Sequence, residues 1–238
     1  MTASTARSVL VTGGNQGIGL GIAQRLDAAG HRVAVTHHSS SAPPDLLSVK
    51  CDVADRESVA EAVATVAEEQ GPVELLVYAA GITRDGLMLR MADRDWDDVI
   101  DTDLGGAWAA SRAVLPAMAK ARYGRLLFVG SVVGLLGSAG QANYAAAKAG
   151  MVGLARSLAR EYAGRGITSN VLAPGFVETS MTAGLSEGQR ADIVAKTPMG
   201  RVATIDEVAG VAAFLVSDEA SYVTGAVIPV DGGLGMGH

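Results

Sequence analysis

The sequence predicts an α/β fold in which helices cover both faces of a doubly wound, parallel sheet of about seven strands. Three observations predict it. Short runs of Val, Leu and Ile alternate with longer helical segments along the whole chain. A glycine-rich turn separates the first run from the first helical segment. The chain has 238 residues, of which 49% are hydrophobic, enough for one large core. We therefore expect a single domain over residues 1–238.

The first half of the chain supplies four of the expected strands. Short apolar runs predict strands at 8–11, 32–36, 47–51 and 74–77. Helical composition predicts helices at 20–29, which ends before Gly30, and at 59–69. Residues 96–121 are expected to form two helical stretches that are interrupted near Gly105 and Gly106.

The second half continues the alternation. Strands are expected at 125–129, 167–172 and 226–230, and helices at 142–163 and 205–215. In the longer helix, Met151, Leu154, Ala155 and Leu158 recur at core spacing. Segment 182–198 contains glycines, so we expect either a mobile lid over the substrate or an ordinary surface helix with flexible ends.

Charge and composition exclude several classes of protein. The net charge of −6 argues against nonspecific nucleic-acid binding, which needs a basic face. No apolar stretch approaches the ~18 residues of a membrane span, and residues 1–7 do not resemble a signal peptide. Cys51 is the only cysteine. The adjacent His37 and His38 would point to opposite faces of a strand, so no metal site is predicted. We expect a cytoplasmic protein.

The glycine-rich turn predicts a nucleotide-binding site. A strand precedes it and a helix follows it, which is the context that such a motif requires. Glycines let the backbone approach a pyrophosphate, and the helix N-terminus faces the negative charge with free N–H groups. The motif reads Thr12-Gly13-Gly14-Asn15-Gln16-Gly17-Ile18-Gly19.

Several other candidate residues also follow predicted strands directly. They are Asp52, Gly81, Ser131 and the pair Pro174-Gly175. In open parallel sheets, ligands bind beyond the carboxyl ends of the strands. We therefore expect these residues and the glycine turn to converge on one edge of the sheet.

Tyr144 and Lys148 stand four residues apart on the helix predicted at 142–163. Residues at this spacing share one helix face, so the ammonium can lie beside the phenol. A nearby positive charge favours the phenolate, which would let Tyr144 exchange a proton with a carbonyl oxygen near neutral pH. Ser131 could hold the same oxygen by a hydrogen bond. Considered alone, such a Tyr–Lys pair is more often a surface pair.

Taken together, these motifs resemble the short-chain dehydrogenase/reductase family over essentially the whole chain. The glycine turn, Asp52-Val53, Ala80-Gly81, Ser131, Tyr144-x-x-x-Lys148 and Pro174-Gly175-x-Val177-x-Thr179 occur in the family's order. Within it, the chain is similar to the bacterial, and in particular the actinobacterial, 3-oxoacyl-acyl-carrier-protein reductases. The segments that carry this closer resemblance are 130–134, 140–146, 157–161 and 225–238.

The resemblance implies a Rossmann fold and a role for each matching residue. Ser131 would orient the ketone, Tyr144 would donate the proton, and Lys148 would activate Tyr144 and hold the nicotinamide ribose. Asp103 stands at the position of the family's catalytic asparagine. The cofactor would be held by Gly13, Asn15, Gln16, Gly17, Ile18, Gly19, His38, Asp52, Val53, Ala80, Gly81, Tyr144, Lys148, Pro174, Gly175, Val177 and Thr179.

Two positions of the catalytic region depart from the family pattern. Ala79 replaces an asparagine after the fourth strand, and Asp103 replaces the asparagine that helps to hold a water near the lysine. That asparagine is thought to act mainly through its backbone carbonyl, which an aspartate retains. A carboxylate near Lys148 would compete for its charge and oppose the activation of Tyr144. We expect a working enzyme with a shifted pH profile.

The end of the second strand bears on the choice of cofactor. An acidic residue there would select NAD, but the sequence reads Thr36-His37-His38-Ser39. The arginines that usually grip the 2′-phosphate of NADP are also absent, since Gln16 and His38 stand at the matching places. His38 and Ser39 can still donate hydrogen bonds to a phosphate. We predict NADPH with weakened discrimination against NADH.

The predicted activity is the NADPH-dependent reduction of a 3-oxoacyl thioester to the 3-hydroxyacyl thioester, in fatty-acid or polyketide biosynthesis. The substrate would be linked to acyl carrier protein or to coenzyme A. Arg122 and Arg165 match positions that the subgroup uses to dock the carrier protein, although each could be an ordinary solvated residue. The resemblance also implies a homotetramer. An alternative is a catalytically weak paralogue that binds nucleotide as a partner subunit of a hetero-oligomer.

Overall fold

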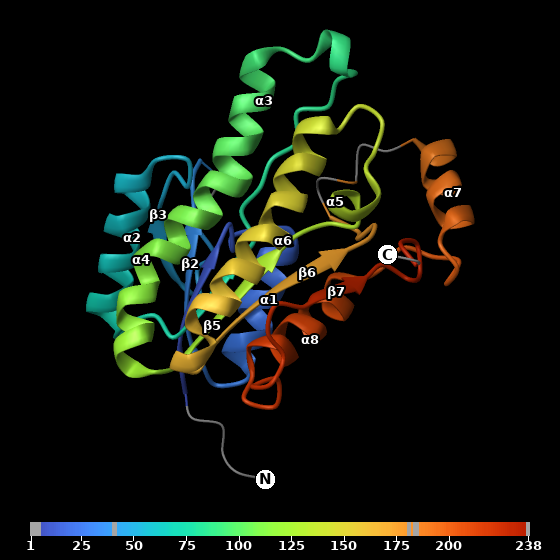
Figure 1. Ribbon diagram of the computed structural model, residues 1–238. Helices are drawn as coiled ribbons and strands as arrows, with labels where there is room; N and C mark the ends of the chain where they lie inside the picture. The colour runs from blue at the N-terminus through green and yellow to red at the C-terminus, as the bar shows by residue number, and fades with distance from the viewer. Residues whose placement is uncertain (1–5, 40–41, 180–181, 183–185, 237–238) are drawn as a thin grey trace.

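A computed structural model describes residues 6–39, 42–179, 182 and 186–236, and it contains a seven-stranded sheet with helices on both faces (Figure 1). The strand order is β3-β2-β1-β4-β5-β6-β7, and all neighbouring strands pair in parallel. The predicted Rossmann-like architecture is therefore confirmed. The strands are β1 (Ser8–Thr12), β2 (Arg32–His37), β3 (Leu47–Lys50), β4 (Leu75–Tyr78), β5 (Gly124–Val129), β6 (Ile167–Pro174) and β7 (Val227–Val230).

Eight α-helices are assigned in the described part of the chain. They are α1 (Gly17–Ala28), α2 (Arg56–Gln70), α3 (Asp93–Val99), α4 (Gly106–Ala121), α5 (Val133–Leu136), α6 (Ala142–Tyr162), α7 (Glu187–Lys196) and α8 (Ile205–Val216). Two 3₁₀ turns, η1 (Met88–Arg90) and η3 (Ala163–Arg165), and a π-helix, η2 (Ile100–Gly105), complete the order. None of the helices in the described ranges is both long and apolar enough to span a bilayer.

The central strands are buried on both faces, which explains their continuous apolar runs. Successive side chains point to opposite faces of a strand. In β4, Leu75 and Val77 therefore join the core beneath α1 and α8, whereas Leu76 and Tyr78 join the core beneath α2, α4 and α6. Figure 1 shows α4 and α6 running side by side across that second face.

The predicted break near Gly105 and Gly106 is wrong. The chain passes from α3 through η2 into α4 without leaving a helical path. Gly106 is required for packing and not for a turn. A Cβ there would collide with the hydroxyl of Tyr78 and lie 2.8 Å from the carbonyl oxygen of Val53. The sequence could not distinguish these two uses of glycine.

Two further elements differ from expectation. Helix α1 begins at Gly17, three residues earlier than predicted, because its first turn lies within the glycine motif. Helix α5 was not predicted, since its four residues are too few for a periodic pattern.

Segment 182–198 contains helix α7, which stands away from the sheet in Figure 1. A capping box between Ser186 and Gln189 begins the helix, and none of its residues is buried. Residues 183–185 of the segment lie outside the described part. The role as a lid stays a prediction.

Candidate active site

The carboxyl ends of β1, β4, β5 and β6 border a cleft of about 480 Å³. Ser131, which follows β5, and Tyr144 and Lys148, which belong to α6, all line it. The convergence expected at this edge is therefore observed. Of the residues predicted to bind cofactor, those in the cleft wall are Gly13, Gln16, Gly17, Ile18, Gly19, Ala80, Gly81, Tyr144, Lys148, Pro174, Gly175, Val177 and Thr179.

The glycine turn forms one wall of the cleft. Gly13 has a φ of 62°, and a Cβ there would lie 2.8 Å from the Cα of Ala80. Only glycine allows this close approach between the turn and the end of β4. Helix α1 starts at Gly17, and Gln16 before it makes no side-chain capping bond. The N-terminus of α1 thus faces the cleft and suits a phosphate group.

Tyr144 and Lys148 lie one turn apart on α6. The Nζ of Lys148 is 5.3 Å from the centroid of the Tyr144 ring. The first turn of α6 is fixed by the buried side chain of Asn143, which donates to the carbonyl oxygens of Arg84 and Asp95, each at 2.9 Å. Its Oδ1 accepts from the Tyr144 N–H at 2.8 Å. Asn143 therefore orients the tyrosine, a role that the sequence did not predict.

Ser131 follows β5 and begins the turn into α5. Its Oγ accepts a hydrogen bond from the N–H of Val133 at 3.1 Å. Helix α5 packs closely on α6 because Gly134 has no side chain; a Cβ there would lie 2.8 Å from the Cβ of Lys148. This contact brings the serine to the same wall as the Tyr–Lys pair.

Lys148 is held by the backbone of Val129 and by the side chain of Asp103. Its Nζ donates to the carbonyl oxygen of Val129 at 3.1 Å and lies 3.0 Å from the Oδ2 of Asp103. The two groups form a buried ion pair. The other oxygen of Asp103 accepts from the N–H of Ile82 at 2.8 Å. A Cβ at Gly81 would come within 2.9 Å of Oδ2, so glycine leaves room for the pair.

Burial dominates the electrostatics of the ion pair. The side chain of Asp103 is 0% exposed and that of Lys148 is 4% exposed. Burial raises the pKa of Asp103, although Lys148 opposes the shift. Burial by itself lowers the pKa of Lys148, but the attraction of Asp103 and Tyr144 outweighs it, and the pKa lies above its ordinary value. The amine is therefore an ammonium at neutral pH.

Other predicted residues lie outside the cleft wall. Val53 belongs to the core beneath α2 and α4. His38 follows β2, and its Nε2 is 3.7 Å from the Oδ2 of Asp52, with both side chains more than half exposed. Asn15 lies within the glycine turn. The cofactor-binding role of these residues stays a prediction.

Arg122 and Arg165 lie at the opposite edge of the sheet from the cleft. Arg122 precedes β5 and Arg165 precedes β6, whereas Ser131 follows β5. The six residues of β5 separate the two edges by about 20 Å. Arg122 also has a structural bond, from its Nη2 to the carbonyl oxygen of Gly164 at 2.9 Å.

The sequence did not single out several residues of the cleft wall as site residues. They lie at the end of β5 or after the end of β4 and belong to no motif with a chemical signature. Position in the fold was the only available signal. These residues are Ile82, Thr83, Arg84 and Val129.

Comparison with known proteins gives matches over the whole chain. A family model described as enoyl-(acyl carrier protein) reductase matches residues 13–235. The 3-oxoacyl-[acyl-carrier-protein] reductase MabA of Mycobacterium avium is 52% identical over 236 residues, covering 99% of this chain and 92% of the relative. MabA of Mycobacterium tuberculosis is 52% identical over 233 residues, covering 98% and 94%. FabG of Escherichia coli, a 3-oxoacyl-[acyl-carrier-protein] reductase, is 48% identical over 235 residues, covering 95% and 96%.

Proposed function

This chain belongs to the short-chain dehydrogenase/reductase family, and we propose that it is an NADPH-dependent 3-oxoacyl-[acyl-carrier-protein] reductase. The observation that carries the proposal is the placement of Ser131, Tyr144 and Lys148 on one cleft beside the glycine turn. The full-length identity of 48 to 52% to reductases of this name supports the substrate class. Fatty-acid biosynthesis is the proposed pathway, with a polyketide pathway as the alternative destination.

The chain's own residues suit the reduction of a ketone. A bound nicotinamide cofactor supplies the hydride. Ser131 orients the carbonyl oxygen, and the hydroxyl of Tyr144 gives it a proton, so that the ketone becomes an alcohol. Within the described part of the chain, no hydrogen bond engages the Tyr144 hydroxyl, which leaves it available to a substrate. Lys148 stabilises negative charge on the phenol after the transfer.

The reductase activity is tested by following NADPH absorbance with an acetoacetyl thioester. We expect consumption by the wild type. A crotonyl thioester in a parallel assay distinguishes ketone reduction from the enoyl reduction that the family model's description names. Turnover of crotonyl thioester alone would contradict the proposal. Cofactor binding without turnover of either thioester would favour the weak paralogue.

We propose His38 as the contact for the 2′-phosphate that distinguishes NADPH from NADH. It follows β2, where a 2′-phosphate contact is expected, and its exposed ring lies beside Asp52. Asp52 competes with the phosphate for the imidazole ring, which supports weak discrimination between NADPH and NADH. Titration of cofactor fluorescence should show that His38→Arg tightens NADPH binding and leaves NADH binding unchanged. Equal effects on both cofactors would remove His38 from this role.

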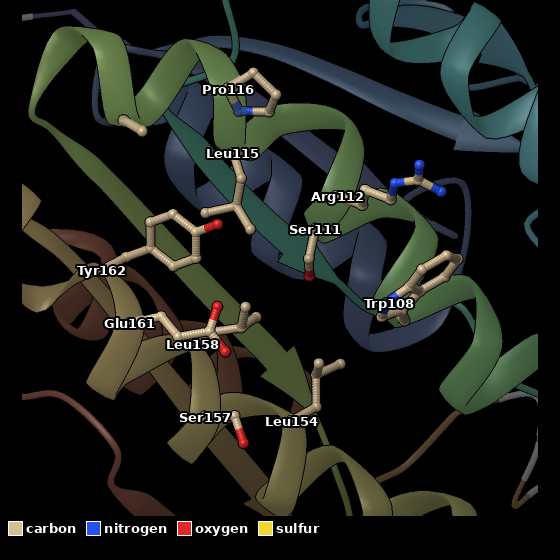
Figure 2. Close-up of a pocket in the computed structure, with 11 residues that line it drawn as sticks. Trp108, Ser111, Arg112, Leu115, Pro116, Leu154, Ser157, Leu158, Glu161 and Tyr162 are labelled. Carbon is tan, nitrogen blue, oxygen red and sulfur yellow. The ribbon is translucent and has the colours of Figure 1, made fainter.

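We propose a homotetramer built from two faces that the single chain leaves open. Figure 2 shows side chains of α4 and α6 around a groove of about 400 Å³, among them Leu115, Leu154 and Tyr162. The second face is the outer side of β7, the last strand of the sheet. It is flanked by Phe214 of α8, which is 49% exposed. Sedimentation should give a tetramer for the wild type and a dimer for Leu154→Arg. A monomeric wild type would exclude this assembly.

We propose that Arg165 docks an acidic carrier protein. Because it lies at the edge opposite its own cleft, a docked carrier would serve the cleft of another copy in the tetramer. Arg165→Glu should raise KM for a carrier-linked substrate and leave KM for a coenzyme-A-linked substrate unchanged. Arg122 is a poorer probe, because it also bonds to Gly164. Equal changes with both substrates would contradict docking.

A further inference from the structure

Tyr78 is a large polar side chain that the described reaction does not use. It is the last residue of β4 and is 0% exposed. It points to the face of the sheet that carries α4 and α6, and therefore toward η2. Burial raises its pKa well above the ordinary value, with Asp103 as a further cause. The hydroxyl therefore stays neutral and can donate a hydrogen bond.

The hydroxyl of Tyr78 donates to the backbone carbonyl oxygen of Thr102. Thr102 lies within the π-helix η2, a type of helix that is rare and often found at functional sites. The accepting carbonyl belongs to the peptide unit that joins Thr102 to Asp103. Because a peptide unit is planar, fixing this carbonyl also fixes the place of the Asp103 Cα, from which the side chain reaches toward Lys148.

The surroundings of Tyr78 match this contact. A Cβ at Gly106 would collide with the hydroxyl, so glycine at this position makes space for it. Gly106 begins α4 directly after the π-helix. The tyrosine thus reaches the helix backbone at the point where η2 passes into α4.

On the other side of the same peptide, Asp103 is fixed by the backbone and by charge. Its Oδ1 accepts from Ile82, and its Oδ2 lies 3.0 Å from the Nζ of Lys148. Val129 accepts a hydrogen bond from the same Nζ. A chain of contacts therefore runs from the Tyr78 hydroxyl through one peptide unit and one carboxylate to the ammonium beside Tyr144.

We propose that Tyr78 is a positioning residue of the reductase site: its hydroxyl fixes the peptide unit between Thr102 and Asp103 and so sets the Asp103 carboxylate against Lys148. The kinetic part of this inference rests on the proposed reductase function. The structural part does not. A tyrosine that only fills the core would affect stability and leave the site geometry unchanged.

The decisive variant is Tyr78→Phe, which removes the hydroxyl and keeps the ring. Crystal structures of the wild type and the variant should show the Nζ–Oδ2 separation growing from an ion-pair distance to beyond roughly 4 Å. An unchanged pair in the variant would overturn the proposal. If Tyr78→Phe does not fold, Tyr78→Met, which is also without a hydroxyl, gives the same comparison.

Kinetics supply the second readout. Asp103→Asn removes the anion that raises the pKa of Lys148, so the alkaline limb of the turnover profile should move to lower pH. Tyr78→Phe should move the alkaline limb in the same direction, by up to about one pH unit. At a fixed pH on that limb, such a shift lowers turnover about tenfold. The double variant should resemble Asp103→Asn alone. Independent, additive shifts would contradict the proposal.

Tyr123→Phe is the matched control. It also loses a tyrosine hydroxyl bond, to Asp218 at 3.0 Å, but at the opposite edge of the sheet. We expect lower thermal stability and an unchanged pH profile. An inactive wild type would refute the reductase function, and the comparison of crystal structures would still decide the role of Tyr78.

Discussion

Two tyrosines lie beside cations at opposite edges of the sheet, and their surroundings differ. At the carboxyl edge, where the carboxyl ends of the strands border the cleft, the Nζ of Lys148 is 5.3 Å from the centroid of the Tyr144 ring. At the amino edge, Tyr123 lies between Arg7 and Arg125, whose ζ carbons are 3.9 and 4.4 Å from its ring centroid. Both sites combine an aromatic ring, a cation and an aspartate.

The amino edge is closed by contacts among its own groups. The Tyr123 hydroxyl donates to the Oδ1 of Asp218, and the Nη2 of Arg125 reaches the same oxygen at 3.2 Å. Arg7 pairs with Glu74 at 2.8 Å. Each cation thus has a carboxylate and an aromatic face as partners within the cluster. The cluster ties the beginnings of β1 and β5 to the loop after α8.

At the carboxyl edge, the aspartate is fully buried and does not line the cleft, whereas the lysine does. Asp103 neutralises part of the ammonium's charge, while Tyr144 lines the cleft. The same residue types therefore form a structural clamp when they satisfy one another, and a reactive site when one polar group is left for a substrate. Four predictions test this difference.

The largest effect is expected for the two tyrosine hydroxyls. Tyr144→Phe removes the proton donor, so turnover should fall by about 10² to 10⁴, with cofactor binding retained. Tyr123→Phe should leave turnover unchanged. NADPH absorbance and cofactor fluorescence measure the two quantities. Comparable losses of turnover in both variants would contradict the proposed functional difference between the two edges.

The second prediction concerns the buried ion pair. Lys148→Met leaves Asp103 charged and unpaired in the core, which costs about 3–5 kcal/mol in the free energy of unfolding. Combining it with Asp103→Asn should recover most of that loss, because the unpaired charge is gone. Urea denaturation of the single and double variants measures it. A double variant less stable than Lys148→Met would show that the pair is not coupled in this way.

The third prediction applies the same change to the amino edge. Arg125→Met loses bonds to the carbonyl oxygens of Gly124 and Gly166 and to Asp218. Because Asp218 is 62% exposed, water solvates it after the change, and the cost should be only about 1–3 kcal/mol. Turnover per folded molecule should stay at the wild-type value. A loss as large as that of Lys148→Met would mean that exposure does not separate the two edges.

The smallest effect is expected from His31, whose Nδ1 accepts from the N–H of Arg7 at 3.2 Å. Burial first, and then Arg7, lower its pKa below 6.5 in the folded chain. The unfolded state therefore binds the proton more readily, and stability should fall as pH drops below about 6.5. Thermal unfolding of His31→Gln should show a weaker pH dependence over that range. An identical pH dependence in the wild type and in His31→Gln would show that the loss of stability at low pH does not come from His31.

Much of the fold was predictable because its signals are local. Apolar runs marked the strands within a residue or two, and the glycine turn marked the phosphate-binding edge. Tyr144 and Lys148 were predictable as neighbours because four residues make one helical turn. Helix α5 and the π-helix were not, because a four-residue helix has no period and a π-helix is set by what packs against it.

The sequence alone determined the order of the elements, the edge at which they meet and the residue types available for proton transfer. Only the tertiary structure decided how deeply Asp103 and Lys148, 45 positions apart, are buried as a pair, and that the Tyr78 hydroxyl reaches Thr102. It also decided that Arg122 and Arg165 stand at the opposite edge from the cleft. Strand and helix patterns follow from neighbouring residues. Buried polar contacts depend instead on how distant segments of the chain pack together, and no local pattern encodes that packing.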